Sequence, residues 1–166
     1  MLIILGGLPG TGKTTIARAL AKSIRATHIR VDTIEQELVR IGIAPDDLND
    51  KGYRIAFRVA EDNLRLGQLV IADTVNPVEE SRVAWRAVAE RAGVPIKEIE
   101  IVCSAEDVHR TRVETRKTDI EGLKLPTWDD VQAREYEPWS GAQLLDTAEK
   151  TVAVCLAEIE GLLARA

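Results

Sequence analysis

The chain has 166 residues, of which 45% are hydrophobic and 30% charged, and this composition excludes a disordered or membrane-embedded chain. Its 22 basic and 27 acidic residues give a net charge of −5, which argues against a protein that tracks long nucleic acids. Met1 leads directly into the first apolar run and leaves no room for a targeting peptide. We therefore expect a cytoplasmic protein with a single domain over residues 1–166 and no membrane partner.

Strand-like and helix-like segments alternate along the whole chain. In chain order, strands are expected at 2–5, 27–31, 69–72, 96–102 and 143–145. Helices are expected at 13–24, 34–41, 51–66, 77–92, 105–116, 128–136 and 148–164. This alternation predicts an α/β fold of three layers, with a five-stranded, mostly parallel sheet and helices on both of its faces.

A phosphate-binding loop lies between the first strand and the first helix, where residues 7–14 read G-L-P-G-T-G-K-T. In this motif, glycines let the backbone N–H groups surround the β-phosphate and the lysine reaches the β- and γ-phosphates. The threonine hydroxyl binds Mg²⁺, and the helix N-terminus adds partial positive charge. The loop therefore predicts a nucleoside triphosphate with Mg²⁺, held by Gly7, Leu8, Pro9, Gly10, Thr11, Gly12, Lys13, Thr14 and Thr15.

Two aspartates follow expected strands. Asp73 ends the third strand, as the Walker-B carboxylate does, and is expected to orient Mg²⁺ together with Thr14. Asp32 ends the second strand, so it should lie at the same edge of the sheet, where it could orient or deprotonate an acceptor hydroxyl. Alternatively, Asp32 caps the helix that follows, with Glu35 completing a capping box. One residue could do both.

A basic segment follows the fourth strand. Arg112 and Arg116 are four residues apart, which places them on one helix face, beside the irregular stretch 117–126. We expect a small lid over about 110–127 that brings both arginines to the triphosphate and stabilises charge during transfer. The alternative is a solvated helix face.

Other arginines are candidates for an anionic substrate: Arg54 and Arg58, four apart on one expected helix, and Arg82 on the next. Each is equally well explained as ordinary surface. His28 and His109 lack metal-ligand spacing, so no zinc site is expected.

With these motifs, the chain resembles the small phosphate-loop kinases: the kinase half of phage polynucleotide kinase, chloramphenicol phosphotransferase, gluconate kinase and adenylylsulfate kinase. The resemblance implies ATP as donor, Asp32 as the acid beside the acceptor hydroxyl, and Arg112 and Arg116 as lid arginines. It matches the family's D-x-x-N with Asp73 and Asn76, and places the adenine near Thr147. Where the polynucleotide kinase half has a substrate-binding arginine, this chain has Glu35.

The function expected from these features is a kinase that moves the γ-phosphate of ATP to a hydroxyl of a small molecule. Lys13, Asp32, Arg112 and Arg116 are its expected catalytic residues, with Asp32, Arg54, Arg58, Asn76 and Arg82 as candidates for acceptor contacts. Two alternatives stay open. One is a regulatory ATPase that binds a partner in one nucleotide state. The other is a kinase of nucleic-acid 5′-hydroxyls, against which Glu35 and the acidic net charge argue.

Overall fold

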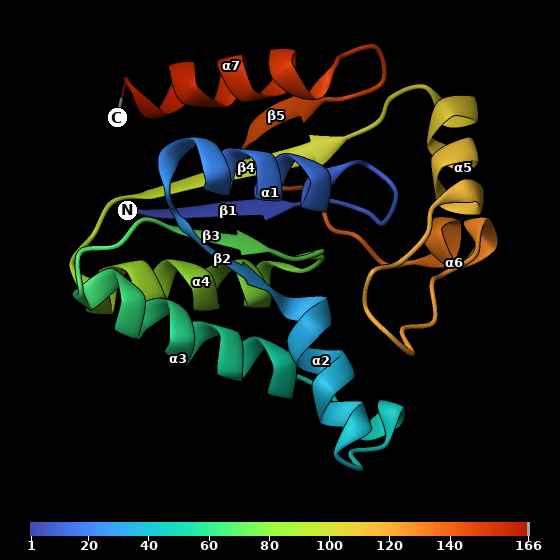
Figure 1. Ribbon diagram of the computed structural model, residues 1–166, viewed down its shortest axis with the longest axis horizontal. Coiled ribbons are helices and arrows are strands. Elements are labelled where there is room, and N and C mark those ends of the chain that lie inside the picture. Colours follow the sequence, from blue (N-terminus) through green and yellow to red (C-terminus); the bar gives the residue numbers. More distant parts are fainter. Residues whose placement is uncertain (166) are drawn as a thin grey trace.

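The computed structural model describes residues 1–165 and shows five strands, seven α-helices and one short 3₁₀-helix (Figure 1). In chain order they are β1 (Leu2–Gly6), α1 (Lys13–Ile24), β2 (Thr27–Arg30), α2 (Val31–Arg40), η1 (Pro45–Asp47), α3 (Lys51–Arg65), β3 (Val70–Asp73), α4 (Glu79–Ala92), β4 (Ile96–Val102), α5 (Glu106–Thr115), α6 (Trp128–Ala133), β5 (Gln143–Asp146) and α7 (Val152–Leu163).

The strands form one sheet in the order β2-β3-β1-β4-β5, and every neighbouring pair is parallel. Leu5 lies opposite Asp73 and Asp73 opposite Arg30, so the carboxyl ends of these three strands share one edge. In an open parallel sheet this is the edge where ligands bind. The predicted three-layer α/β fold is confirmed.

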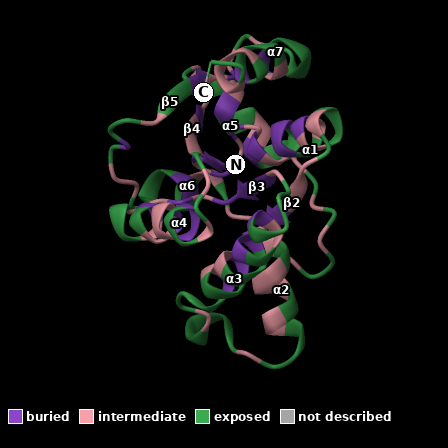
Figure 2. Ribbon diagram, turned by 90° about the vertical axis from the view of Figure 1, so that its left-hand side faces the viewer, coloured by how far each residue is buried: buried purple, intermediate pink, exposed green. Residues whose placement is uncertain are grey.

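Two hydrophobic cores cover the two faces of the sheet. Alternate residues of β1 point to opposite faces, so Leu2 and Ile4 pack toward α3 and α4, while Ile3 and Leu5 pack toward α1 and α7. Burial is accordingly concentrated on the sheet and on the inner sides of these helices (Figure 2). The helices α5 and α6 lie beyond the carboxyl edge instead (Figure 1). No helix within residues 1–165 is long and apolar enough to cross a membrane.

Two helix starts differ from the sequence-based prediction by three residues or more. The helix expected at 34 begins at Val31, so Asp32 lies in its first turn, where a negative charge favours the helix dipole. Its N-cap is Arg30, which makes no side-chain cap, so the predicted capping role of Asp32 and Glu35 is wrong. The helix expected at 148 begins at Val152, because Thr151 caps it by accepting a hydrogen bond from the backbone N–H of Val154.

Candidate active site

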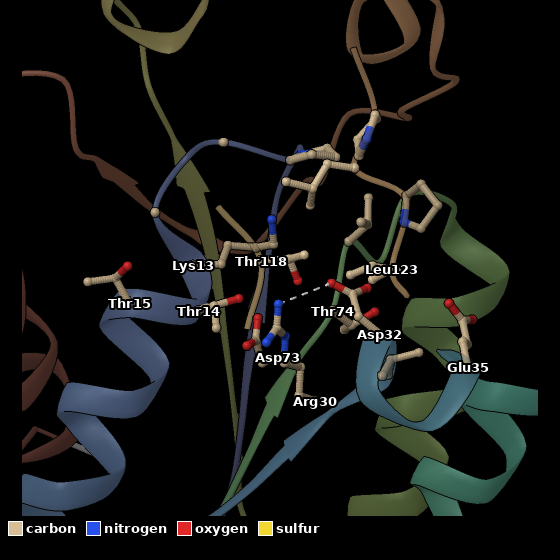
Figure 3. Close-up of a pocket in the computed structure, with 18 of the residues that line it drawn as sticks. Lys13, Thr14, Thr15, Arg30, Asp32, Glu35, Asp73, Thr74, Thr118 and Leu123 are labelled. Carbon is tan, nitrogen blue, oxygen red and sulfur yellow. Dashed lines mark ion pairs between the residues drawn. The ribbon is translucent and has the colours of Figure 1, made fainter. Parts of the chain in front are cut away.

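A cleft of about 990 Å³ lies at the carboxyl edge of the sheet. Its floor is the phosphate loop, residues 7–14, together with the ends of β2 and β3. Its walls are α2 and α3 on one side and the end of α5 with the lid segment, residues 116–127, on the other. Figure 3 shows Lys13, Thr14 and Asp73 gathered at one side of this cleft, with Asp32 and Glu35 reaching in from α2. The expected meeting of phosphate loop and strand-end carboxylates is therefore observed.

The phosphate loop is shaped by backbone that only glycine adopts easily. Gly7, Gly10 and Gly12 have φ angles of 136°, 88° and 97°. A Cβ added at Gly7 would lie 2.1 Å from the carbonyl oxygen of Ile101, so a larger residue there cannot fit without moving β4. Gly12 is the N-cap of α1, which leaves the first N–H groups of that helix directed at the loop.

Lys13 is buried at the N-terminus of α1. Its Nζ donates a hydrogen bond of 2.8 Å to the carbonyl oxygen of Leu8 within the loop. Burial lowers the pKa of Lys13 to about 8, and the carboxylates of Asp73 and Asp32 act in the opposite direction. The cleft thus holds a desolvated ammonium group, which favours an anionic ligand that would offset its desolvation.

Asp73 is 3% exposed at the end of β3 and faces the cleft beside Thr14. Its Oδ2 lies 3.1 Å from Nε2 of His28, a residue of the neighbouring strand β2. Its other carboxylate oxygen makes no hydrogen bond among residues 1–165, and neither does the Thr14 hydroxyl. Two oxygen ligands are thus available next to Lys13, a donor set that fits Mg²⁺.

Opposite charges meet on the α2 side of the cleft. The Asp32 carboxylate is partly exposed and lies 3.8 Å from the guanidinium of Arg30 (Figure 3). Arg116 is half-buried, and neither a hydrogen bond nor an ion pair links its guanidinium group to residues 1–165. Burial lowers the pKa of Arg116, whereas Asp32 raises it, so the two groups are close enough to interact.

The two predicted lid arginines do not share a face. α5 ends at Thr115, and Arg116 follows it in extended conformation, which directs Arg116 toward Lys13 and Asp32. Arg112 instead donates hydrogen bonds to the hydroxyl and carbonyl oxygens of Thr147, at 2.8 and 2.9 Å. The structure therefore separates the expected pair into one arginine beside Lys13 and Asp32 and one that contacts the loop after β5.

Thr147 borders the cleft, but its hydroxyl contacts other parts of the protein. Besides receiving Arg112, it lies 2.8 Å from the carbonyl oxygen of Thr11 and 3.0 Å from that of Val102. His109 of α5 makes a second contact of this kind, because its Nε2 lies 2.8 Å from the carbonyl oxygen of Pro9. The phosphate loop is consequently braced from two sides.

The lid segment is fixed to the body of the protein by an acidic residue. Asp119 accepts hydrogen bonds from Arg18 of α1 and Arg30 of β2, and these two guanidinium groups lower its pKa to about 2. The lid was predicted from the basic residues of this stretch, and Asp119 was not among the residues singled out. In the structure, an ion-pair cluster holds the segment over the cleft.

Two residues expected to bind substrate are structural. Arg82 is fully buried and donates hydrogen bonds to carbonyl oxygens of residues 76, 77, 137 and 138, while its guanidinium lies over the rings of Tyr136 and Trp139. Asn76 is also fully buried, in a left-handed turn with φ of 52°, and does not line the cleft. The predicted substrate contacts of Arg82 and Asn76 are therefore wrong.

Replacing Arg82 by methionine is expected to reduce the free energy of unfolding by about 3 kcal/mol or more, because several buried carbonyl groups lose their donors. Urea unfolding of this variant and of Arg54→Met, whose side chain is exposed, measures the difference. The folded fraction of Arg82→Met should bind nucleotide normally. A stable variant with impaired substrate binding would restore the substrate role.

Arg54 and Arg58 lie away from the cleft. Both are exposed on the outer side of α3, around a separate shallow depression shared with Arg91, and Arg58 pairs with Glu61 at 3.4 Å. The helix periodicity located them correctly on one face. That face points away from the phosphate loop, so their predicted acceptor contact is not supported.

Several site residues were missed by the sequence analysis. Tyr53 of α3 lines the cleft, and its hydroxyl accepts hydrogen bonds from the Thr74 hydroxyl at 2.5 Å and from the Asn76 N–H at 3.1 Å. His28 and Asp119 make their contacts with residues 45 and 89 positions away in the chain. The contact of His28 with Asp73 could have been expected only from the pairing of β2 with β3. No local pattern indicates that Tyr53 or Asp119 belongs to the site.

Comparison with known proteins identifies the family. The AAA domain family matches residues 2–138. The "Probable adenylyl-sulfate kinase" of Aeropyrum pernix is 31% identical over 160 residues, which cover 92% of this chain and 86% of that protein. Among solved structures, the Mycobacterium tuberculosis APS kinase in complex with AMPPNP and APS has a TM-score of 0.75 at 21% identity, covering 98% and 96% of the two chains. A Sinorhizobium meliloti gluconokinase has a TM-score of 0.63 at 18% identity, covering 99% and 96%. At these identities the two structures show the shared fold alone. The profile match and the Aeropyrum relative show that this chain belongs to the AAA domain family, among its small P-loop kinases.

Proposed function

We propose that the protein transfers the γ-phosphate of ATP to a hydroxyl group of a small molecule. The observation that carries this proposal is a single cleft in which the Asp32 carboxylate faces Lys13 and Arg116. The cations suit a phosphate chain, and the carboxylate suits the proton of an attacking hydroxyl. A site for hydrolysis alone does not require a carboxylate on a separate acceptor wall.

The nucleotide would be held by the phosphate loop. Its N–H groups and Lys13 surround the β- and γ-phosphates, and Thr14 with Asp73 would hold Mg²⁺, which supplies charge neutralisation on the phosphate oxygens. Arg112 and Thr147 brace the other end of the loop, where the nucleoside would lie. We therefore assign Arg112 to nucleotide positioning and Arg116 to the transferred group.

The transfer itself is a displacement at the γ-phosphorus. The acceptor oxygen forms a bond to phosphorus, the bond between that phosphorus and the β,γ-bridging oxygen breaks, and ADP leaves with the bonding electrons. Asp32 orients the acceptor hydroxyl and accepts its proton, while Arg116 stabilises negative charge on the transferring phosphoryl group. The lid segment, held by Asp119, excludes water from the cleft and so limits hydrolysis.

The direct test is a screen for acceptors that stimulate ADP release. Sugars, sugar acids, nucleosides, antibiotics and adenylyl sulfate are each added to the protein with ATP and Mg²⁺. We expect one class to raise ADP release well above the rate without acceptor and to yield a phosphorylated product. A protein whose ATP turnover stays the same with every acceptor, and changes only with a protein partner, would contradict the proposal.

His28 is expected to position Asp73 for the metal. Replacing His28 by leucine leaves a buried carboxylate without its partner, so the Mg²⁺ concentration at half-maximal nucleotide binding should rise about 10–100-fold. The measurement is a Mg²⁺ titration of nucleotide binding followed by tryptophan fluorescence, with thermal unfolding recorded alongside.

His28→Gln is the matched control, because its amide nitrogen can donate to Asp73 in place of Nε2. This variant should keep most of the Mg²⁺ affinity. If leucine and glutamine shift the Mg²⁺ midpoint equally, or neither shifts it, His28 has no positioning role.

A further inference from the structure

Glu35 is an unpaired carboxylate in the acceptor side of the cleft. It lies one turn beyond Asp32 on α2, and both side chains project from that helix into the cleft (Figure 3). Glu35 is only partly exposed, and its carboxylate makes no hydrogen bond or ion pair with residues 1–165. The phosphate-transfer step described above does not use it.

The neighbouring helix leaves space for this side chain. A Cβ added at Gly52 of α3 would lie 2.3 Å from Cγ of Glu35 and 2.9 Å from its Oε1. Gly52 has an ordinary helical φ, so the position does not need glycine for its backbone conformation. Because glycine has no Cβ, the side chain of Glu35 can approach α3 closely at this position, and it packs there instead of turning into solvent.

The surroundings of Glu35 are acidic and aromatic. Asp32 lies on the same helix, Asp50 precedes α3, and the rings of Tyr53 and Phe57 line the same wall. Burial and the charge of Asp32 raise the pKa of Glu35 to about 7. Arg134 acts in the opposite direction, but its side chain is exposed and its charge is screened by water.

We infer that the acceptor is an amine-bearing alcohol, whose ammonium group binds Glu35 beside the Tyr53 ring while its hydroxyl lies at Asp32. This inference rests on the proposed function. An ammonium group would donate hydrogen bonds to the unpaired carboxylate and gain from the aromatic faces next to it. A carboxylate or sulfate at the same place would be repelled by two acidic side chains.

The charge of Glu35 makes this preference depend on pH. Because its pKa is raised to about 7, Glu35 is mostly protonated at pH 6 and mostly ionised at pH 8. Ammonium binding needs the ionised form, so affinity should rise about tenfold between these two pH values, and a proton should be released on binding near pH 7. A neutral acceptor would not show this rise, and an anionic acceptor would bind more weakly as pH increases.

The experiment compares three open-chain probes with one six-carbon framework: glucamine (1-amino-1-deoxysorbitol), sorbitol and gluconate. The primary ammonium of glucamine stays charged at both pH 6 and pH 8, so the charge of Glu35 is what changes between them. Binding of each probe is measured by calorimetry at these two pH values in the presence of a non-hydrolysable ATP analogue, and ADP release is measured separately with ATP. We expect glucamine to bind about tenfold more tightly than sorbitol at pH 8 and gluconate to bind worst. Glu35→Gln should abolish both the preference and its pH dependence, while Glu37→Gln, on the exposed side of the same helix, should change neither.

Gly52→Ala supplies a second variant, because its methyl group would displace Glu35 without altering charge. It should weaken glucamine binding and leave binding of the ATP analogue unchanged. Equal or tighter binding of sorbitol or gluconate, no saturable glucamine binding, or a glucamine preference that survives in Glu35→Gln would each overturn the inference. ADP release stimulated by gluconate would uphold the kinase function and reject the amine. Glucamine binding without any ADP release would uphold the role of Glu35 and reject the kinase.

Discussion

Replacing Asp32 by asparagine is expected to reduce phosphoryl transfer to the acceptor by about 10²–10⁴-fold, the range for losing a general base. Asparagine keeps the size of the side chain but cannot accept the proton of the hydroxyl. Affinity for ATP should be unchanged or slightly higher. The Asp32 charge is close enough to act on Lys13, so it also repels a triphosphate bound there, and asparagine removes that repulsion. Acceptor-stimulated ADP release and binding of an ATP analogue, measured side by side, separate the two effects.

Glu37→Gln provides the matched control, since it removes a carboxylate from the exposed face of the same helix, where Glu37 pairs with Arg40 at 3.0 Å. This variant should transfer phosphate at the original rate. If Asp32→Asn keeps full turnover with the acceptor, Asp32 neither orients nor deprotonates it, and the carboxylate that carries the proposal has no catalytic role. A loss of ATP binding in Asp32→Asn would instead indicate damage to the phosphate loop.

The fold was predictable wherever a local pattern determines an element. The bounds of α1 and β4 agree with the expected 13–24 and 96–102. The phosphate loop marks the start of α1, and a segment rich in β-branched residues between Pro95 and Ser104 marks β4. The start of α2 was not predictable, because Arg30 caps it without any side-chain hydrogen bond and so leaves no signal in the sequence.

The site was predictable for the donor and much less so for the acceptor. The phosphate loop is a continuous motif, and the strand-end positions of Asp32 and Asp73 follow from the parallel sheet. In contrast, the direction of Arg82 depends on whether its helix face meets Tyr136 and Trp139, which are more than 50 residues away. From the sequence alone, an arginine on a helix is interpreted as a surface residue or as a ligand contact. No local pattern shows that four backbone carbonyl groups surround the Arg82 side chain.

Glu35 was singled out in the sequence, but the role predicted for it was wrong for the same reason. Its position three residues beyond Asp32 suggested a capping box, which is a local interaction that sequence spacing can express. In the structure Glu35 makes no cap; its side chain packs against Gly52 of the neighbouring helix α3 instead. Glu35 therefore belongs to the wall of the cleft at which we propose the acceptor binds. In the proposed kinase, acceptor specificity would depend on such contacts between helices, which no local sequence pattern expresses.

Replacing Lys13 by alanine is expected to reduce ATP turnover by about 10²–10³-fold, because it removes the ammonium group directed at the phosphates. The protein without nucleotide should stay folded, since burial lowers the pKa of Lys13 to about 8 and its charge is therefore a cost to the empty site. Nucleotide should accordingly raise the melting temperature of the unmodified protein and fail to raise that of Lys13→Ala.

Lys22→Ala is the control for this change, because Lys22 is an exposed lysine at the other end of α1. It removes the same net charge from the same helix, so any general effect of charge on ATP affinity appears in both variants. A specific effect appears only at Lys13, where the cation is desolvated and therefore acts more strongly on a phosphate than one in water. Equal turnover in the two variants would mean that the loop does not hold the phosphates through Lys13, and the donor half of the proposed kinase would have to be sought elsewhere in the cleft.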